Sequence, residues 1–84
     1  MAPLSKLLRT YEAVIRGGSV NFRDFEALLL ALGFELARQA GSHQIYVHPK
    51  LERPFPIQPD GKDAKRYQIR ELSDIIRKYR LSLD

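Results

Sequence analysis

The hydrophobic residues of this 84-residue chain change their period at Gly33. Before Gly33 they recur at spacings of three and four, which is typical of helices, and after it they alternate, which is typical of strands. Residues 22–32 carry one apolar helical stripe. Residues 34–39 and 43–48 are strand-like, and the turn at Gly41–Ser42 separates them. This order favours a small antiparallel sheet covered by helices.

Further helices are predicted on either side of this region. A first helix runs from residue 3 to residue 16, and Gly17–Gly18 ends it. The second helix begins at Phe22, where Asn21 can cap it. A last helix follows a polar loop at residues 60–66. The stripes of the first and last helices are Leu4, Leu7, Leu8, Tyr11 and Ile15, and Ile69, Leu72, Ile76 and Tyr79, respectively.

Residues 54–59 can extend, but three of them are prolines, which cannot donate hydrogen bonds to a strand ladder. This segment is therefore predicted to be a short edge strand. The expected fold is α+β, with a three-stranded antiparallel sheet, helices on one face and an extra N-terminal helix. We expect a single domain over residues 1–84, in which residues 1–18 hold the extra helix and residues 19–81 form the core.

Composition narrows the class of protein. The chain has no cysteine, which excludes disulfides and thiolate zinc sites and is consistent with a cytoplasmic protein. Its longest apolar run, residues 27–32, is far shorter than the roughly 18 residues that span a membrane, and no secretory signal pattern precedes it. We therefore expect a cytoplasmic protein without membrane contact.

The net charge is +4, and most of the excess lies in the second half of the chain. Residues 1–42 carry five Lys/Arg and four Asp/Glu, whereas residues 43–84 carry nine and six. A basic surface of this kind suits either the phosphate backbone of a nucleic acid or an acidic protein partner.

The chain has two histidines, His43 and His48. Residues five apart on a strand point to opposite faces, so the two cannot bind one ion, and we expect neither a metal nor a cofactor. His43 directly follows the turn, where it is either a catalytic base or a hydrogen-bonded structural residue. By parity it shares a face with Ile45 and Val47, which is expected to be the apolar side. His48 precedes Pro49 and is expected to end the strand.

The run "RQAGSHQIYVHP", residues 38–49, follows a helix ending in "LGF" and opens a strand pair. From residue 22 to residue 81 the chain resembles the HicA toxins of prokaryotic toxin–antitoxin pairs. The resemblance implies a fold like a double-stranded-RNA-binding domain and a metal-independent ribonuclease that cuts messenger RNA and halts translation. It also implies that His43 is the essential histidine and that a HicB-type antitoxin covers the active surface. The first helix and the start of the last helix, "KRYQIRELSDII", depart from the family pattern.

Metal-independent RNA cleavage uses the ribose 2′-hydroxyl as nucleophile, so it needs a base and cations that stabilise the phosphoryl oxygens. His43 is the candidate base. Tyr46, opposite Ile45 and Val47 by parity, is expected on an open face where it can stack on a base. The other residues expected to bind RNA are Arg38, Gln39, Ser42, Lys62, Lys65 and Arg66.

Two other functions fit the same residues. One is a non-catalytic RNA-binding module that uses the same basic surface and does not require His43. The other is a protein-interaction domain whose basic surface docks an acidic partner. Binding of RNA at low salt and cleavage of that RNA separate the three hypotheses.

Overall fold

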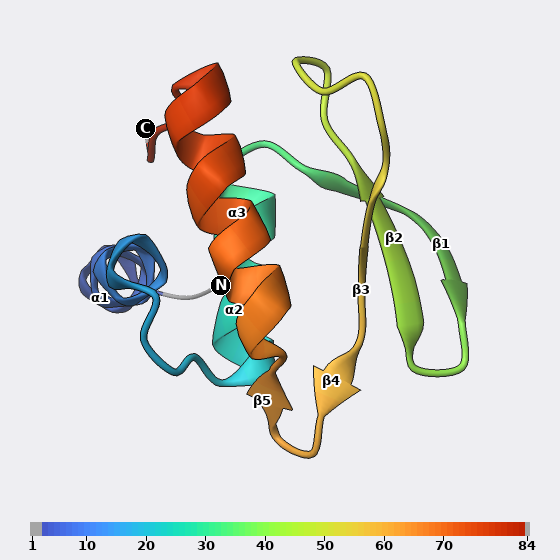
Figure 1. Ribbon diagram of the computed structural model, residues 1–84, viewed down its shortest axis with the longest axis horizontal. Coiled ribbons are helices and arrows are strands. Elements are labelled where there is room, and N and C mark those ends of the chain that lie inside the picture. Colours follow the sequence, from blue (N-terminus) through green and yellow to red (C-terminus); the bar gives the residue numbers. More distant parts are fainter. Residues whose placement is uncertain (1–2, 84) are drawn as a thin grey trace.

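The computed structural model describes residues 3–83 (Figure 1). In chain order the elements are α1 (Leu4–Arg16), α2 (Phe22–Ala31), β1 (Glu35–Ala40), β2 (His43–Val47), β3 (Phe55–Ile57), β4 (Pro59–Asp60), β5 (Asp63–Ala64) and α3 (Arg66–Tyr79). Strands β1, β2 and β3 form an antiparallel sheet in that order, and α2 and α3 cover one of its faces. The predicted α+β fold, with the order of a double-stranded-RNA-binding domain after an N-terminal helix, is confirmed.

Helix α2 begins and ends where the sequence predicts. The side-chain oxygen of Asn21 accepts a hydrogen bond of 2.8 Å from the backbone N–H of Arg23, which caps the helix. At the other end Gly33 has φ +100°, a conformation that a residue with a Cβ rarely adopts. The chain therefore turns directly from α2 into Phe34 and β1.

The sheet is built around the β1–β2 hairpin. Gly41 has φ +61° in its turn, and Ala40 pairs with His43 at the last rung. The register shifts between Leu36 and Arg38, as expected for a β-bulge. Strand β3 pairs with β2 and forms an edge of the sheet, as predicted from its prolines.

The core lies between the sheet and the two helices that cover it. Its phenylalanines are tilted against one another, with ring centroids 6.4 Å apart for Phe25 and Phe55 and 6.1 Å apart for Phe34 and Phe55. Burying one such side chain stabilises the fold by about 1.5–3 kcal/mol. Other buried core residues are Leu28, Leu29, Tyr46, Ile57, Ile69, Leu72 and Ile76.

Helix α1 packs against α2 and α3, and Figure 1 shows it on the side of these helices away from the sheet. Its buried residues are Thr10 and Val14, whereas Leu4 and Leu8 are 63% and 46% exposed. The predicted stripe of α1 is therefore partly wrong, because apolar spacing does not tell on which side the neighbouring helices lie. Arg77 Nη2 of α3 donates to the carbonyl oxygen of Ile15 at 3.0 Å and ties α1 in place.

The segment predicted as a polar loop, residues 60–66, is more ordered than expected. Within it β4 pairs with β5 across a turn at Gly61, and this hairpin is attached to the start of α2. The backbone N–H of Phe22 donates to the Lys62 carbonyl oxygen, and that of Ala64 donates to the Val20 carbonyl oxygen, both at 2.9 Å. Strands of two residues have no detectable periodicity, so the sequence did not predict them.

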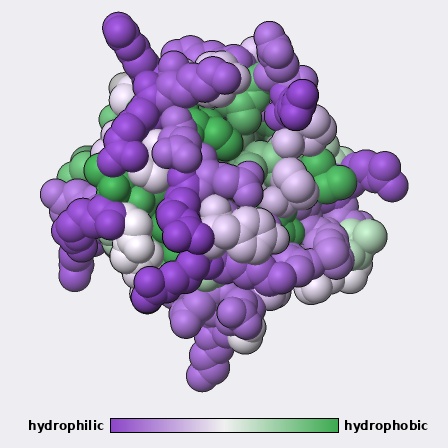
Figure 2. Space-filling model, viewed as in Figure 1, coloured by the Kyte–Doolittle hydropathy of each residue, from purple (hydrophilic) through white to green (hydrophobic). Residues whose placement is uncertain are grey.

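Hydrophilic side chains cover most of the face seen in Figure 2, and apolar atoms are visible in the gaps between them. Between residues 3 and 83, no helix is both long enough and apolar enough to cross a membrane.

Candidate active site

His43 is the first residue of β2, and its side chain is exposed. It lines a shallow pocket of about 220 Å³ together with residues of β3, of the segment after it, and of α3. In Figure 1 the turn before His43 and the first turn of α3 lie at the same end of the molecule. The pocket residues are His43, Pro56, Ile57, Gln58, Tyr67, Gln68 and Glu71.

The position of His43 is set by the hairpin turn before it. Ala40 pairs with His43, and the side-chain amide of Gln39 donates to the carbonyl oxygen of Gly41 at 3.3 Å. Gln39 therefore supports the turn rather than facing the pocket. A histidine at the end of a paired strand has a fixed backbone and an open approach for a ligand.

Gln68 holds the two walls of the pocket together. Its side chain is 4% exposed, and its amide nitrogen donates to the Pro56 carbonyl oxygen at 3.2 Å. Its amide oxygen accepts from the backbone N–H of Gln58 at 3.3 Å. One buried amide from α3 thus satisfies two backbone groups at β3 and fixes the distance between the strand and the helix.

The face of β2 that carries His43 is the uncovered one. Ile45 on this face is half-buried and Val47 is 38% exposed, whereas Gln44 and Tyr46 on the other face are buried. The expectation that Ile45 and Val47 lie on the core side is wrong. Since α2 and α3 cover the opposite face, His43 is open to solvent.

The prediction that Tyr46 lies on an open face is wrong for the same reason, because its face of β2 is the one that the helices cover. Its ring is 2% exposed, its hydroxyl donates to Gln44 Oε1 at 2.8 Å, and Gln44 Nε2 donates to Glu26 Oε2 at 2.9 Å. Burial raises the pKa of the Tyr46 hydroxyl, and the negative charge of Glu26 raises it further. Tyr46 is a core residue with a satisfied hydroxyl, and it cannot stack on a base of RNA.

The other predicted RNA-binding residues lie around the pocket rather than in it. Arg38 pairs with Ile45, so it projects from the same face as His43, and like Ser42 it is exposed. Lys65 is half-buried at the N-cap of α3, and Arg66, the first residue of the helix, is exposed. The first turn of α3 contains no acidic residue and no side-chain cap. The backbone N–H groups of Gln68 and Ile69 donate to the Lys65 carbonyl oxygen, which leaves those of Arg66 and Tyr67 to face an anion.

Lys62 is exposed at the tip of the β4–β5 hairpin and belongs to a different hollow. That pocket lies at the start of α2, and it is also lined by Arg23, a cation that the sequence analysis did not single out. The structure thus brings Lys62 to the start of α2 and does not bring it into the pocket of His43.

His48 has a structural role. The backbone N–H of Lys50 donates to its Nδ1 at 3.0 Å, so the ring proton is on Nε2, which donates to the Leu32 carbonyl oxygen at 3.0 Å. The ring also packs edge-on against Phe34, with centroids 4.9 Å apart. His48 therefore joins the end of β2 to the end of α2. Among residues 3–83, no three His, Cys, Asp or Glu side chains are grouped closely enough to hold a metal ion.

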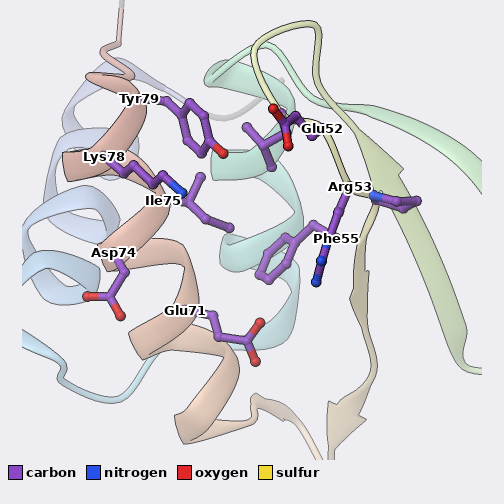
Figure 3. Close-up of a pocket in the computed structure, with 10 residues that line it drawn as sticks. Glu52, Arg53, Phe55, Glu71, Asp74, Ile75, Lys78 and Tyr79 are labelled. Carbon is purple, nitrogen blue, oxygen red and sulfur yellow. The ribbon is translucent and has the colours of Figure 1, made fainter.

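A larger pocket of about 420 Å³ lies further along α3 (Figure 3). Phe55 and Ile75 contribute its apolar surface, and Glu52 and Arg53 come from the loop before β3. It contains none of the residues predicted from the sequence. It shares Glu71 with the pocket of His43, so the two hollows adjoin along the helix.

Six pocket residues were missed by the sequence analysis, and one of them had a usable signal. Tyr67 does not belong to the apolar stripe of α3, so an exposed position was predictable, and its side chain is 50% exposed. The sequence contains no comparable signal for the other five, because their proximity to His43 depends on how β3 pairs with β2 and how α3 packs on β3. These are Pro56, Ile57, Gln58, Gln68 and Glu71.

The family comparison matches the same part of the chain. A model of the HicA toxin of bacterial toxin–antitoxin systems matches residues 22–78, more than half of the sequence. Searches of curated proteins and of solved structures found no significant match. The matched segment begins at the first residue of α2, ends within α3 and includes every residue that lines the pocket of His43. The chain therefore belongs to the HicA family, whose members are toxins that pair with antitoxins.

Proposed function

We propose that this toxin is an endoribonuclease that cuts messenger RNA and thereby inhibits translation, with His43 as the general base. The observation that carries the proposal is the position of His43, which is exposed at a pocket within the family-matched segment. Histidine is the side chain whose usual pKa suits proton transfer near neutral pH.

The proposed reaction uses the RNA's own nucleophile. A neutral His43 takes the proton of a ribose 2′-hydroxyl, and the oxygen attacks the adjacent phosphorus. The bond from phosphorus to the 5′-oxygen breaks, the 5′-oxygen takes up a proton, and a cyclic phosphate remains on the other fragment. A well-placed base contributes about 10²–10⁴-fold to such a step. No metal is required for this route.

Cations around the pocket are proposed to hold the RNA backbone. Arg38 shares the exposed face of His43, and Lys65 and Arg66 flank the open first turn of α3. Ser42 and Gln39 belong to the turn beside His43, and Lys62 extends the basic surface toward the start of α2. Such contacts position a nucleic acid without reading its sequence.

The antitoxin is proposed to be of the HicB type and to inhibit the toxin by covering the pocket of His43. Co-expression with the antitoxin encoded beside the toxin gene is expected to restore growth. Protection of His43 from solvent in the complex, measured by hydrogen exchange of the β1–β2 hairpin, would show that the antitoxin binds over this surface.

The test of the proposal is a comparison of the wild-type chain with His43→Ala. Expressed without an antitoxin, the wild type is expected to arrest growth and His43→Ala to be harmless. Purified wild type is expected to cleave RNA in the presence of EDTA and to leave cyclic phosphate ends. Because His43 is exposed, the substitution should change the free energy of unfolding by no more than about 0.5 kcal/mol.

Lys50→Ala, an exposed substitution in the loop after β2, serves as the matched control and should remain toxic. Equal toxicity of His43→Ala and wild type would remove His43 from the mechanism. Salt-dependent RNA binding without cleavage would support the non-catalytic RNA-binding module instead.

A further inference from the structure

We infer that the pocket beside His43 is a binding site for one unpaired base of the RNA, with the ring of Tyr67 as its stacking surface. The inference rests on the proposed function and specifies its substrate as single-stranded RNA at the point of cleavage. It gives the family-matched segment a base-contacting residue in place of Tyr46, which is buried.

Tyr67 combines exposure with a fixed position. It lies in the first turn of α3, outside the buried stripe, and is 50% exposed. Its hydroxyl oxygen is 3.5 Å from Gln68 Nε2, the nitrogen that also donates to the Pro56 carbonyl oxygen. The buried amide that sets the width of the pocket is thus also in contact with the ring. An aromatic side chain held in this way loses little conformational entropy when a base stacks on it.

The other groups around the pocket suit a base and its sugar. Pro56, exposed on β3, adds a second apolar ring, and His43 lies at the same pocket. The volume of about 220 Å³ is below the roughly 300–1,000 Å³ of pockets for drug-sized ligands, so it suits one small ring system. A base stacked on Tyr67 would bring the attached ribose toward His43.

Two polar side chains are available for the edge of the base. Within residues 3–83, the carboxylate of Glu71 and the side-chain amide of Gln58 have no hydrogen-bond or ion-pair partner. Glu71 points from α3 into the groove beside β3 (Figure 3). A carboxylate accepts from an amino or ring N–H group, and an amide both donates and accepts, so the two side chains can bind the polar edge of a base.

This geometry excludes a base that remains in a helix. In double-stranded RNA the bases are stacked on one another and the major groove is too narrow for side chains, so Tyr67 cannot reach a base face. Only a base in a loop, bulge or single strand can turn out and stack on it. Cleavage should therefore occur at unpaired nucleotides.

The experiment compares wild type, Tyr67→Ala and Tyr67→Phe on one RNA whose cleaved nucleotide is either in a loop or paired by a complementary strand. Tyr67→Ala is expected to lower kcat/KM on the loop by about 5- to 150-fold, the range for loss of one stacked base. Tyr67→Phe keeps the ring and should stay within about threefold of wild type. Glu71→Gln replaces an acceptor-only group with an amide and should change which base is preferred at the cleaved position.

Leu30→Ala is the matched control, since Leu30 is also exposed, at 57%, and does not line the pocket. Wild-type kcat/KM in Tyr67→Ala, or equal cleavage of loop and duplex, would overturn the inference. Binding of an RNA with a 2′-deoxy nucleotide at the cleaved position, which cannot be cut, tests the base site separately from the proposed nuclease. If wild type never cleaves RNA but Tyr67→Ala still weakens this binding, the nuclease proposal fails and the base site stands.

Discussion

At the scale of single residues, Tyr46 and His43 show that the two faces of one strand can have different roles, one in the core and one toward a ligand. The two side chains belong to opposite faces of β2, and only the face of Tyr46 is covered by helices. On the covered side a polar atom must be paired, which the chain from Tyr46 through Gln44 to Glu26 achieves. On the uncovered side a polar group is free to act on a ligand.

Tyr46→Phe is expected to change the dependence of stability on pH. Because burial and Glu26 raise the pKa of Tyr46 in the folded state, its stabilising effect is complete below the ordinary value of 10.0 and is lost as pH rises above it. The free energy of unfolding of wild type should therefore fall more steeply than that of Tyr46→Phe once pH rises above about 10. Urea denaturation across this range measures the difference, and parallel curves would contradict the assignment.

The same substitution should also be costly at neutral pH. Loss of the hydroxyl leaves Gln44 Oε1 without its donor in a buried position, which costs about 1–3 kcal/mol.

Parity on a strand was predictable from the sequence, and the identity of the covered face was not. Alternation shows that His43, Ile45 and Val47 share one side of β2. It does not show which side the helices cover, and here the side with the two aliphatic residues is the open one. Which face is covered depends on the packing of Tyr46 into one core with residues of α2 and α3, and these helices are distant from β2 in the sequence.

At the scale of elements, the junction between α2 and β1 depends on Gly33. Its φ of +100° is unfavourable for any other residue, and a Cβ there would lie 3.1 Å from His48 Nε2. That nitrogen is held by the Leu32 carbonyl oxygen, so the ring cannot move without breaking a hydrogen bond. The junction and the end of β2 are therefore packed as one unit.

Gly33→Ala is expected to lower the free energy of unfolding by at least about 1–2 kcal/mol, from backbone strain alone. Gly18→Ala is the matched control, because a Cβ at Gly18 meets only the Ala13 carbonyl oxygen at 3.5 Å and its φ is not positive. That variant should be neutral or more stable by up to about 1 kcal/mol. Thermal unfolding measures both effects. Similar destabilisation by the two substitutions would show that neither the positive φ of Gly33 nor its close approach to His48 requires glycine.

Most elements were predictable because each has a local signal. Asn21 caps α2, Gly33 ends it, Gly41 marks the hairpin, and the prolines of β3 restrict it to an edge. The β4–β5 hairpin has only a turn signal, at Asp60–Gly61, because its strands are too short to show a period. It is stabilised instead by hydrogen bonds to Val20 and Phe22, which are far from it in sequence.

At the scale of the whole molecule, basic residues occur at both ends, and this allows a controlled test of the proposed RNA surface. Lys62, Lys65 and Arg66 lie at the end that carries His43, whereas Lys50, Arg53 and Lys78 are exposed toward the other end (Figure 1). The two sets carry the same charge, so their replacement separates local contacts from the effect of net charge.

Replacing Lys62, Lys65 and Arg66 with alanine is expected to weaken RNA binding and to reduce its salt dependence. For single strands, the slope of log K against log salt is about −0.7 per phosphate contact, so losing three contacts should reduce its magnitude by about 2. Filter binding over a salt series measures the slope. The control variant with Lys50, Arg53 and Lys78 replaced should keep the wild-type slope, and an equal reduction in both variants would contradict a localised surface.

The position of α1 could be predicted only in part. The helix itself was predicted, but it packs on both α2 and α3 and buries Thr10 and Val14 rather than Leu4 and Leu8. Thr10 can be buried because its hydroxyl donates to the Lys6 carbonyl oxygen at 3.0 Å. A threonine among leucines was not an obvious buried position, since only the local hydrogen bond makes its burial acceptable.

The contacts of Gln68 also determine at which stage of synthesis the pocket of His43 can form. Gln68 belongs to α3, and it fixes the width of a pocket whose other wall, β3, and whose histidine precede it in the chain. A nascent chain that has produced the hairpin with His43 still lacks half of the pocket. The site can form only after the ribosome has passed α3 and released that helix from its exit tunnel. Under the function proposed for it, the toxin would therefore become active only after its own synthesis has moved beyond the residue proposed as the general base.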